Sequence, residues 1–212
     1  MIFFSNKNRP FHFGPYPLER LARDEKVAEI ERKASRDPKP GNKEAVNTRY
    51  TEALGTYHEI FREFCKGEPA PAKAPVPDDL DKRMIDIKGA GYFLDASQIG
   101  ICELSEGCWY EGVTPENHTH AVVVMVEYSR LPEEDNLAHN WLKNSMHETA
   151  EMRAFEVAIG IANHIRMMGF NAIGYDDENE QLDVNRLTVL SGLGVRQADK
   201  VVNPYLDSDY AV

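Results

Sequence analysis

The sequence predicts an α/β fold in which helices flank a mixed β-sheet and an N-terminal helical arm precedes the core. Two observations lead to this prediction. Several segments carry apolar residues at three- and four-residue spacing, the periodicity of helices that bury one face. Between them lie short apolar runs rich in β-branched residues, and strands that alternate with helices are typical of an α/β sandwich.

Residues 1–66 are expected to form the arm, with helices over Leu18 to Ala34 and Asn47 to Lys66. The apolar stripe expected on the second helix consists of Leu54, Tyr57, Ile60, Phe61 and Phe64. Residues 67–79 follow as a proline-dense linker, because prolines remove backbone donors and favour an extended spacer. We therefore expect this linker to lie on the surface, with an α/β core over residues 80–212.

Within the core, the run HAVVVMVEYS from His120 to Ser129 predicts a strand that is buried on both faces and central to the sheet. A long amphipathic helix is expected from Ser145 to Met168, with Gly169 as its stop. The remaining expected elements are a helix over Leu80 to Gly91, a strand around Ile99 to Leu104, a strand in FNAIGYD, a helix in DVNRLTVLSGLG and a strand in DKVVNPYL.

Composition and charge exclude several classes of function. The formal net charge of -11, without a basic cluster among aromatics, argues against nucleic acid as a partner. No window approaches the length of apolar chain that a membrane helix requires, and the start lacks the apolar core of a signal peptide. Three cysteines without CxxC spacing indicate neither a disulfide framework nor a metal cluster. A cytoplasmic protein without membrane attachment is expected.

The stretch RLTVLSGLGVRQADKVVNP contains the most suggestive loop of the chain. It does not match the dinucleotide fingerprint, because the third glycine is missing and the preceding pattern is helical. Glycine removes the Cβ that blocks close approach, so the loop could bring backbone N–H groups to an anionic or bulky polar ligand. The alternative is a helix C-cap followed by a turn, and the residues alone leave both open.

Other polar residues form no convincing catalytic group. His118 and His120 would share one face of an extended segment and could bind a metal, but no third ligand is identifiable. Cys102 is expected to be a small buried hydrophobe, and Cys108 is ambiguous. The acidic residues expected to form a solvated face of the long helix are Glu148, Glu151 and Glu156.

Four stretches in order resemble the N-terminal part of corrinoid-dependent reductive dehalogenases, with epoxyqueuosine reductases as more distant relatives. These stretches are IKGAGYFLDASQIGICEL, HAVVVMVEYSR, EVAIGIANHIRMMGFNAIGYD and LTVLSGLGVRQADKVVNPYL. The opening FFSNKNRPFHFGPYPLERL, without a twin-arginine leader, is similar to the soluble, catabolic branch of that family. The resemblance covers nearly the whole chain and is best from about Met84 to Leu206.

The resemblance implies a nitroreductase-like core that binds cobalamin, with the backbone of the glycine loop facing the corrinoid. The residues it implies for cofactor binding are Ser191, Gly192, Leu193, Gly194, Asn203 and Pro204. It also implies a halogenated aromatic substrate of the phenol or hydroxybenzoate type and a redox partner that donates electrons. The family's iron-sulfur clusters and proton-donating tyrosine lie beyond the matched region, so no catalytic or metal-binding residue is assigned here.

Three functions are therefore compared. The first is the cobalamin-binding N-terminal region of a reductive dehalogenase, incomplete without a C-terminal iron-sulfur part. The second is a non-catalytic corrinoid-binding or interaction protein on the same fold. The third, which the residues support least, is a metal hydrolase that uses His118 and His120.

Overall fold

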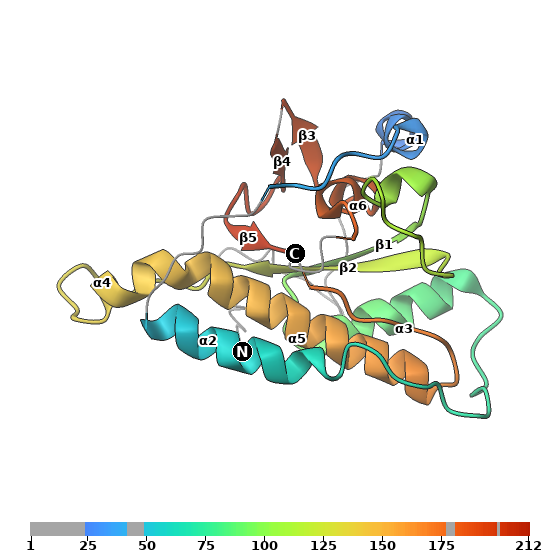
Figure 1. Ribbon diagram of the computed structural model, residues 1–212, viewed down its shortest axis with the longest axis horizontal. Coiled ribbons are helices and arrows are strands. Elements are labelled where there is room, and N and C mark those ends of the chain that lie inside the picture. Colours follow the sequence, from blue (N-terminus) through green and yellow to red (C-terminus); the bar gives the residue numbers. More distant parts are fainter. Residues whose placement is uncertain (1–23, 42–48, 177–180, 199) are drawn as a thin grey trace, which may run out of the picture.

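The computed structural model describes residues 24–41, 49–176, 181–198 and 200–212, and its centre is a three-stranded sheet between two layers of helices (Figure 1). The strands lie in the order β1-β2-β5, with bounds β1 Gln98–Glu103, β2 His120–Glu127 and β5 Tyr210–Ala211. Both pairs are antiparallel. The α/β class is confirmed, but the described strands do not form the mixed sheet that was predicted.

Strand β2 is the interior strand that the sequence predicted. Val123, Val124, Met125 and Val126 are all buried, and their side chains alternate between the two faces. Val123 and Met125 pack with α6 (Val184–Leu190), whereas Val124 and Val126 pack with α5 (Met146–Met167). The continuous apolar run thus reflects helices on both faces, and it does not require parallel neighbouring strands.

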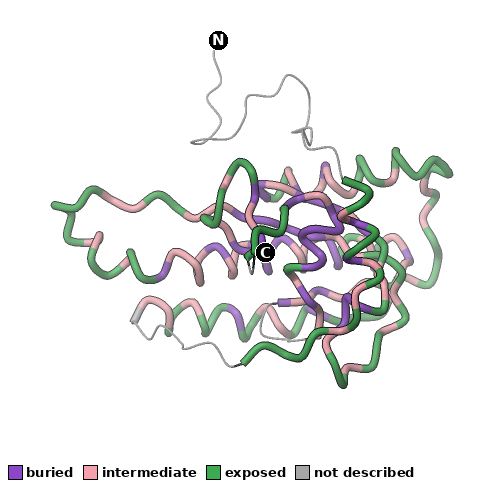
Figure 2. Tube along the Cα trace, turned by 90° about the horizontal axis from the view of Figure 1, so that it is seen from above, coloured by how far each residue is buried: buried purple, intermediate pink, exposed green. Residues whose placement is uncertain are grey.

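Helices lie on both faces of the sheet. Helices α3 (Leu80–Phe93) and α5 lie on one face, and α2 (Arg49–Arg62) packs on α5 from outside (Figure 1). Helix α1 (Glu25–Lys33) lies on the other face beside α6. The buried residues gather between these layers, and the connecting segments are largely exposed (Figure 2). No helix within the described parts of the chain is long and apolar enough to cross a membrane.

Several short elements had no counterpart in the prediction. They are η1 (Glu106–Cys108), α4 (His139–Leu142), η2 (Lys143–Ser145), β5 and β3 (Val195–Gln197), which forms an antiparallel hairpin with β4 (Lys200–Val202). The predicted strand in DKVVNPYL corresponds to β4, although Asp199 lies outside the described residues. Residues 18–23 and 47–48 of the two predicted arm helices also lie outside them.

The buried face of α2 differs from the predicted stripe. His58 is buried and stacks edge-on against Phe155 of α5, with ring centroids 4.5 Å apart. Phe61 and Cys65 join this contact. The members of the predicted stripe that are exposed instead are Tyr57, Ile60 and Phe64. The helix therefore turns His58 and Phe61 toward α5 and leaves the other aromatic positions of the stripe outside the contact.

Residues 67–79 form a surface connection, as predicted, and none of them is buried. The segment runs past the C-terminal end of α5, where Ala70 N–H donates to Arg166 O at 2.8 Å and Ala74 N–H to Met168 O at 2.9 Å. The division of the chain at this segment into an arm and a core stays a prediction.

The predicted strand FNAIGYD is wrong, because residues 170–176 are not assigned to a strand. Their polar backbone groups bind other partners. Gly174 N–H donates to Cys65 O at 2.9 Å, and the buried Arg166 donates to Ala172 O at 2.9 Å. Because these groups are satisfied outside a sheet, the segment can cross the molecule as an extended connection.

Candidate functional site

The six residues implied for cofactor binding lie together in the structure. Asn203 Nδ2 donates to the carbonyl of Leu193 at 2.6 Å, which ties the loop after β4 to the loop after α6. Ser191, Leu193, Gly194 and Asn203 are buried, Gly192 is half-buried and Pro204 is exposed. The contact between Leu193 and Asn203 joins the two short segments that contain these residues.

The loop after α6 has the geometry of a helix C-cap. Gly192 has a φ of 80°, the left-handed conformation that glycine adopts without strain. Its N–H donates to Val189 O at 3.0 Å, and the N–H of Leu193 donates to Thr188 O at 3.0 Å. This pair of bonds defines a Schellman motif. Gly194 N–H also donates to Thr188 O, at 3.2 Å. The backbone donors of the loop are therefore used within the chain.

The residues packed around Gly194 leave no room for a side chain at this position. A Cβ at this position would lie 2.6 Å from Val201 Cγ1 and 3.0 Å from Thr188 Cγ2. The space that a side chain would need is filled by β4 and α6, not left open as a cradle. The close approach that glycine permits here is an approach of the chain to itself.

Asn203 uses its side chain fully inside the protein. Nδ2 donates to Leu193 O and to Gln98 Oε1 at 2.8 Å, and Oδ1 accepts from the N–H groups of Tyr205 at 2.9 Å and Leu206 at 3.0 Å. Asn203 therefore has a structural role: its side chain links the loop after α6 to the turn after β4. A corrinoid contact at this cluster stays a prediction, and in this conformation only the edge formed by Gly192 and Pro204 is accessible for it.

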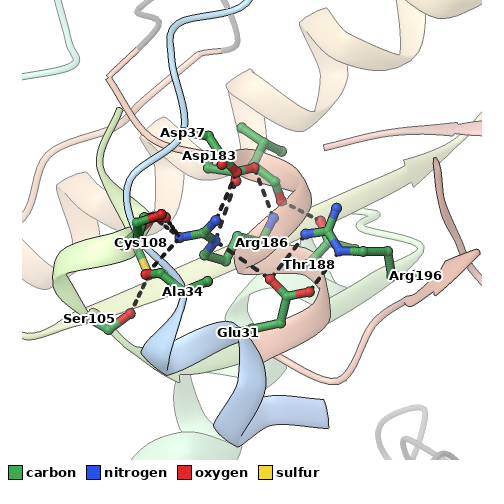
Figure 3. Close-up of polar contacts among 12 residues, drawn as sticks. Glu31, Ala34, Asp37, Ser105, Cys108, Asp183, Arg186, Thr188 and Arg196 are labelled. Carbon is green, nitrogen blue, oxygen red and sulfur yellow. Dashed lines mark hydrogen bonds and ion pairs between the residues drawn. The ribbon is translucent and has the colours of Figure 1, made fainter. Parts of the chain in front are cut away.

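An ionic cluster centred on the buried Arg186 lies beside the loop and joins α1 to α6 (Figure 3). We call it the Arg186 cluster and define it as Glu31, Asp37, Asp183, Arg186 and Arg196. Arg186 is 3% exposed; its Nη2 lies 2.8 Å from Asp37 and its Nε lies 3.5 Å from both Glu31 and Asp183. Arg196 binds Glu31 through two nitrogens, at 2.7 and 3.0 Å.

The Arg186 side chain also donates to the carbonyls of Ser35, at 2.8 Å, and of Gly107. It thereby fastens the segment after α1 and the 3-10 turn η1 to the start of α6. Asp183 is the N-cap of α6, accepting from Arg186 N–H at 3.0 Å, and burial raises the pKa of its carboxyl, with the charge of Asp37 adding to this. The arrangement is suited to holding the arm on the core.

His118 and His120, which the sequence offered as possible metal ligands without a third partner, are not joined by a third ligand among the described residues. His120 is exposed and its Nδ1 lies 2.9 Å from Thr119 Oγ1, whereas His118 is half-buried. Within the described ranges, no group of three histidine, cysteine or acidic residues could hold a metal ion.

The cysteines and acidic residues are placed largely by packing. Cys65, Cys102 and Cys108 are all free and buried, which confirms the expectation for Cys102. Burial raises the pKa of the Cys65 thiol. Of the three glutamates expected on a solvated face, Glu156 is exposed, but Glu148 and Glu151 are half-buried because α5 turns this side toward the core.

A cavity of about 190 Å³ lies between α5, β2 and residues 171–176, and the sequence analysis did not identify it. His118 and His120 line its rim, and Tyr175 lines its wall. The Tyr175 hydroxyl is buried and makes no hydrogen bond within the described structure, and burial raises the pKa of Tyr175 to about 12. Behind it, Asp176 accepts from Arg62 Nε at 2.8 Å and lies 3.7 Å from His58 Nε2.

Comparisons with solved structures identify relatives of this fold. The catabolic reductive dehalogenase NpRdhA matches with a TM-score of 0.69 and 31% identity, over 81% of this chain and 24% of that one. A variant of the same enzyme matches with a TM-score of 0.71 and 30% identity, over 83% and 25%. NpRdhA in complex with 3-bromo-4-hydroxybenzoic acid matches with a TM-score of 0.68 and 31% identity, over 81% and 24%.

A further structure of a reductive dehalogenase, described with a mechanism for B12-dependent dehalogenation, matches equally well. No family model and no curated protein matches the sequence. The likeness expected from the sequence is confirmed, and the chain spans about a quarter of the length of these relatives.

Proposed function

We propose that this chain, a relative of the catabolic reductive dehalogenases, is the N-terminal region of a cobalamin-dependent enzyme that removes halogen from halogenated phenols or hydroxybenzoates. The observation that carries the proposal is the likeness to NpRdhA at 31% identity across 81% of the chain. The binding of a bromohydroxybenzoate by that relative supports the substrate class. The nitroreductase-like core, the iron-sulfur clusters and the electron-donating partner belong to the same proposal, as does a cytoplasmic location.

The contribution of this chain to cobalamin binding is the open part of the proposal. The backbone N–H groups from Ser191 to Gly194 donate to carbonyls of α6, and the side chain of Asn203 is hydrogen-bonded within two loops. These residues do not form a free cradle in this conformation. A contact with cobalamin would use the exposed surface at Pro204 and the half-buried Gly192.

This geometry favours a second candidate function, in which the chain is a non-catalytic interaction module within the longer enzyme. The module would hold the N-terminal arm and present its surface to the remaining domains, while cobalamin is bound elsewhere. The engaged donors of the glycine loop are the specific observation that supports this alternative.

Cobalamin titration followed by absorbance distinguishes the two roles. The titration is made on the 212-residue chain and on a longer protein that includes the iron-sulfur part, and halide release from a bromohydroxybenzoate is assayed on the latter. If the loop contacts cobalamin, Pro204→Ala should weaken binding about three- to tenfold, the loss of roughly 0.7 to 1.4 kcal/mol. Pro40→Ala, at an exposed proline of the arm, is the matched control.

Unchanged affinity in Pro204→Ala, together with normal halide release by the longer protein, would assign this chain the role of an interaction module. Absence of halide release from every halogenated aromatic tested would contradict the dehalogenase proposal itself.

A further inference from the structure

One edge of the central strand β2 is open along most of its length. Strand β1 pairs with β2 from His120 to Met125 on one side, whereas β5 pairs on the other side only with Val126 and Glu127 (Figure 1). The residues of β2 from His120 to Met125 therefore have no strand beside them at this edge within the described chain. An open edge in the interior of a protein is unusual, because its backbone groups must find partners.

The hydrogen-bond pattern identifies which groups face the open edge. Leu104 N–H donates to Thr119 O at 2.9 Å, and in an antiparallel pair alternate residues direct both backbone groups to the same neighbour. The odd-numbered residues of β2 therefore direct their backbone N–H and C=O groups toward β1. The backbone groups of Val122 and Val124 point in the opposite direction, toward the open edge. Neither residue makes a backbone hydrogen bond on this side to any described residue. Val124 is nevertheless only 4% exposed.

The cavity described above lies along this same edge. Its lining includes the β2 residues from Ala121 to Val124, together with Phe155 from α5, Trp109 and Leu187 from the opposite layer, and Val212. The two layers that sandwich the sheet thus continue past the edge of β2, and the space left between them has the position of a further strand.

The register of β5 leads directly into this space. Tyr210 lies opposite Glu127 and Ala211 opposite Val126, so an extended chain places Val212 opposite Met125. The packing agrees: Ala211 belongs to the core on the α5 face, and Val212 packs against the core on the α6 face, the same faces as Val126 and Met125. The next residue in this register would lie opposite Val124, and the third opposite Val122.

We infer that a strand continuing from β5 fills this groove and completes the pairing of Val124 and Val122. The inference rests on the proposed function in one respect, that the polypeptide of the longer protein continues after Val212. Because apolar residues from both layers line the groove beside β2, with Phe155 on one face and Trp109 and Leu187 on the other, the strand must be apolar at consecutive positions there, as β2 itself is. The occupant is therefore a β-branched run and not an alternating strand with one polar face.

The test is to extend the 212-residue chain by five designed β-branched residues and to place prolines in two patterns. Prolines at the first and third added positions remove the N–H groups that would reach the carbonyls of Val124 and Val122. Prolines at the second and fourth positions remove N–H groups that point away from β2, which an edge strand tolerates. The two variants have the same composition, so the second is the control for the first.

We expect the unsubstituted extension to raise Tm by about 2 to 6 °C and to slow amide hydrogen exchange at Val122 and Val124. The proline pattern that faces β2 should abolish both effects, and the outward pattern should keep most of the protection. Unprotected amides at Val122 and Val124 in the unsubstituted extension, or equal loss from both patterns, would overturn the inference.

The alternative is that a small apolar molecule, and not a strand, occupies the cavity. In that case, hydrogen exchange at the amides of Val122 and Val124 would be slowed equally in the two proline variants. The extension contains no cofactor site, so its failure leaves the dehalogenase proposal intact. A failed cobalamin titration likewise leaves the pairing of β2 unaffected.

Discussion

The side chain of Asn203 donates to the carbonyl of Leu193 across 2.6 Å, and through this contact the two loops implied for cofactor binding become one structural unit. The carbonyl of Leu193 directly follows the helix cap at Gly192, and Asn203 directly precedes the turn that leads to β5. The same bond therefore fixes the end of α6 and the approach of the chain to the open edge of β2.

Asn203→Ala should destabilise the protein by about 2 to 4 kcal/mol, because it leaves a buried carbonyl and two turn N–H groups without partners. The free energy of unfolding is measured by denaturant titration. Gln98→Ala is the matched variant, since it removes only the side-chain contact between Gln98 and Asn203 and leaves the bonds of Asn203 to Leu193, Tyr205 and Leu206 in place, and it should cost about 1 kcal/mol. If the two variants lost the same free energy of unfolding, Asn203 would not be the residue that links the two loops.

Gly194→Val should destabilise the fold by about 1 to 3 kcal/mol whether or not a ligand is present, because its Cβ would overlap Val201 Cγ1. Gly194 is thus held by packing against β4 and α6 and is not an open loop position. Combining Gly194→Ala with Val201→Ala tests the cause: the double variant should lose less stability than the sum of the two single variants. Strict additivity in this cycle would show that Val201 does not limit the space.

The secondary structure could be predicted where it depends on local pattern. Val123 to Val126 are apolar at every position, and α5 repeats its apolar residues over 22 positions, so neighbouring residues alone determined β2 and α5. The loop residues and Asn203 lie in the same short stretch of sequence, so they could be considered together before the structure showed their contact. The sequence could not show whether the glycine loop caps α6 or binds a ligand, because glycine is suited to both roles.

The parts that were missed depend on partners distant in sequence. Glu31 and Arg186 meet from helices at opposite ends of the chain, and His58 meets Asp176 across the molecule. One signal was available: Arg166 and Arg186 both stand inside apolar helical segments, and a buried arginine requires several acceptors. The open edge of β2 had no such signal, because an unpaired strand and a paired one have the same sequence pattern.

Glu31→Gln should lower the free energy of unfolding by about 1 to 3 kcal/mol, because it removes the buried charge that Arg186 and Arg196 share, while Asp37 and Asp183 still pair with Arg186. Glu29 stands on the same helix and pairs with Lys33 at 2.7 Å on the exposed side. Glu29→Gln is therefore the matched control and should have no measurable effect on unfolding. If both variants unfolded at the same denaturant concentration, the Arg186 cluster would not be holding the arm.

Tyr175→Phe should leave stability unchanged or increase it slightly at neutral pH, because the hydroxyl it removes is buried without a hydrogen bond. Tyr128→Phe is the matched variant: its hydroxyl lies 2.9 Å from His147 Nδ1, so its removal should cost about 1 kcal/mol. Both are measured by denaturant unfolding at pH 7. A clear loss of stability in Tyr175→Phe would mean that the hydroxyl has a partner.

The same variant predicts a pH dependence at the alkaline end. Burial raises the pKa of Tyr175 to about 12, so its neutral form is favoured in the folded protein. This contribution to stability is fully present below the unfolded pKa of about 10 and is lost as pH rises through the folded value. The wild-type protein should therefore lose stability more steeply between pH 10 and 12 than Tyr175→Phe does, and absorbance titration of tyrosinate should show one fewer late-titrating group in the variant. If a strand fills the groove beside Tyr175, the extended chain should delay this ionisation further, since the added residues remove the remaining water from the hydroxyl.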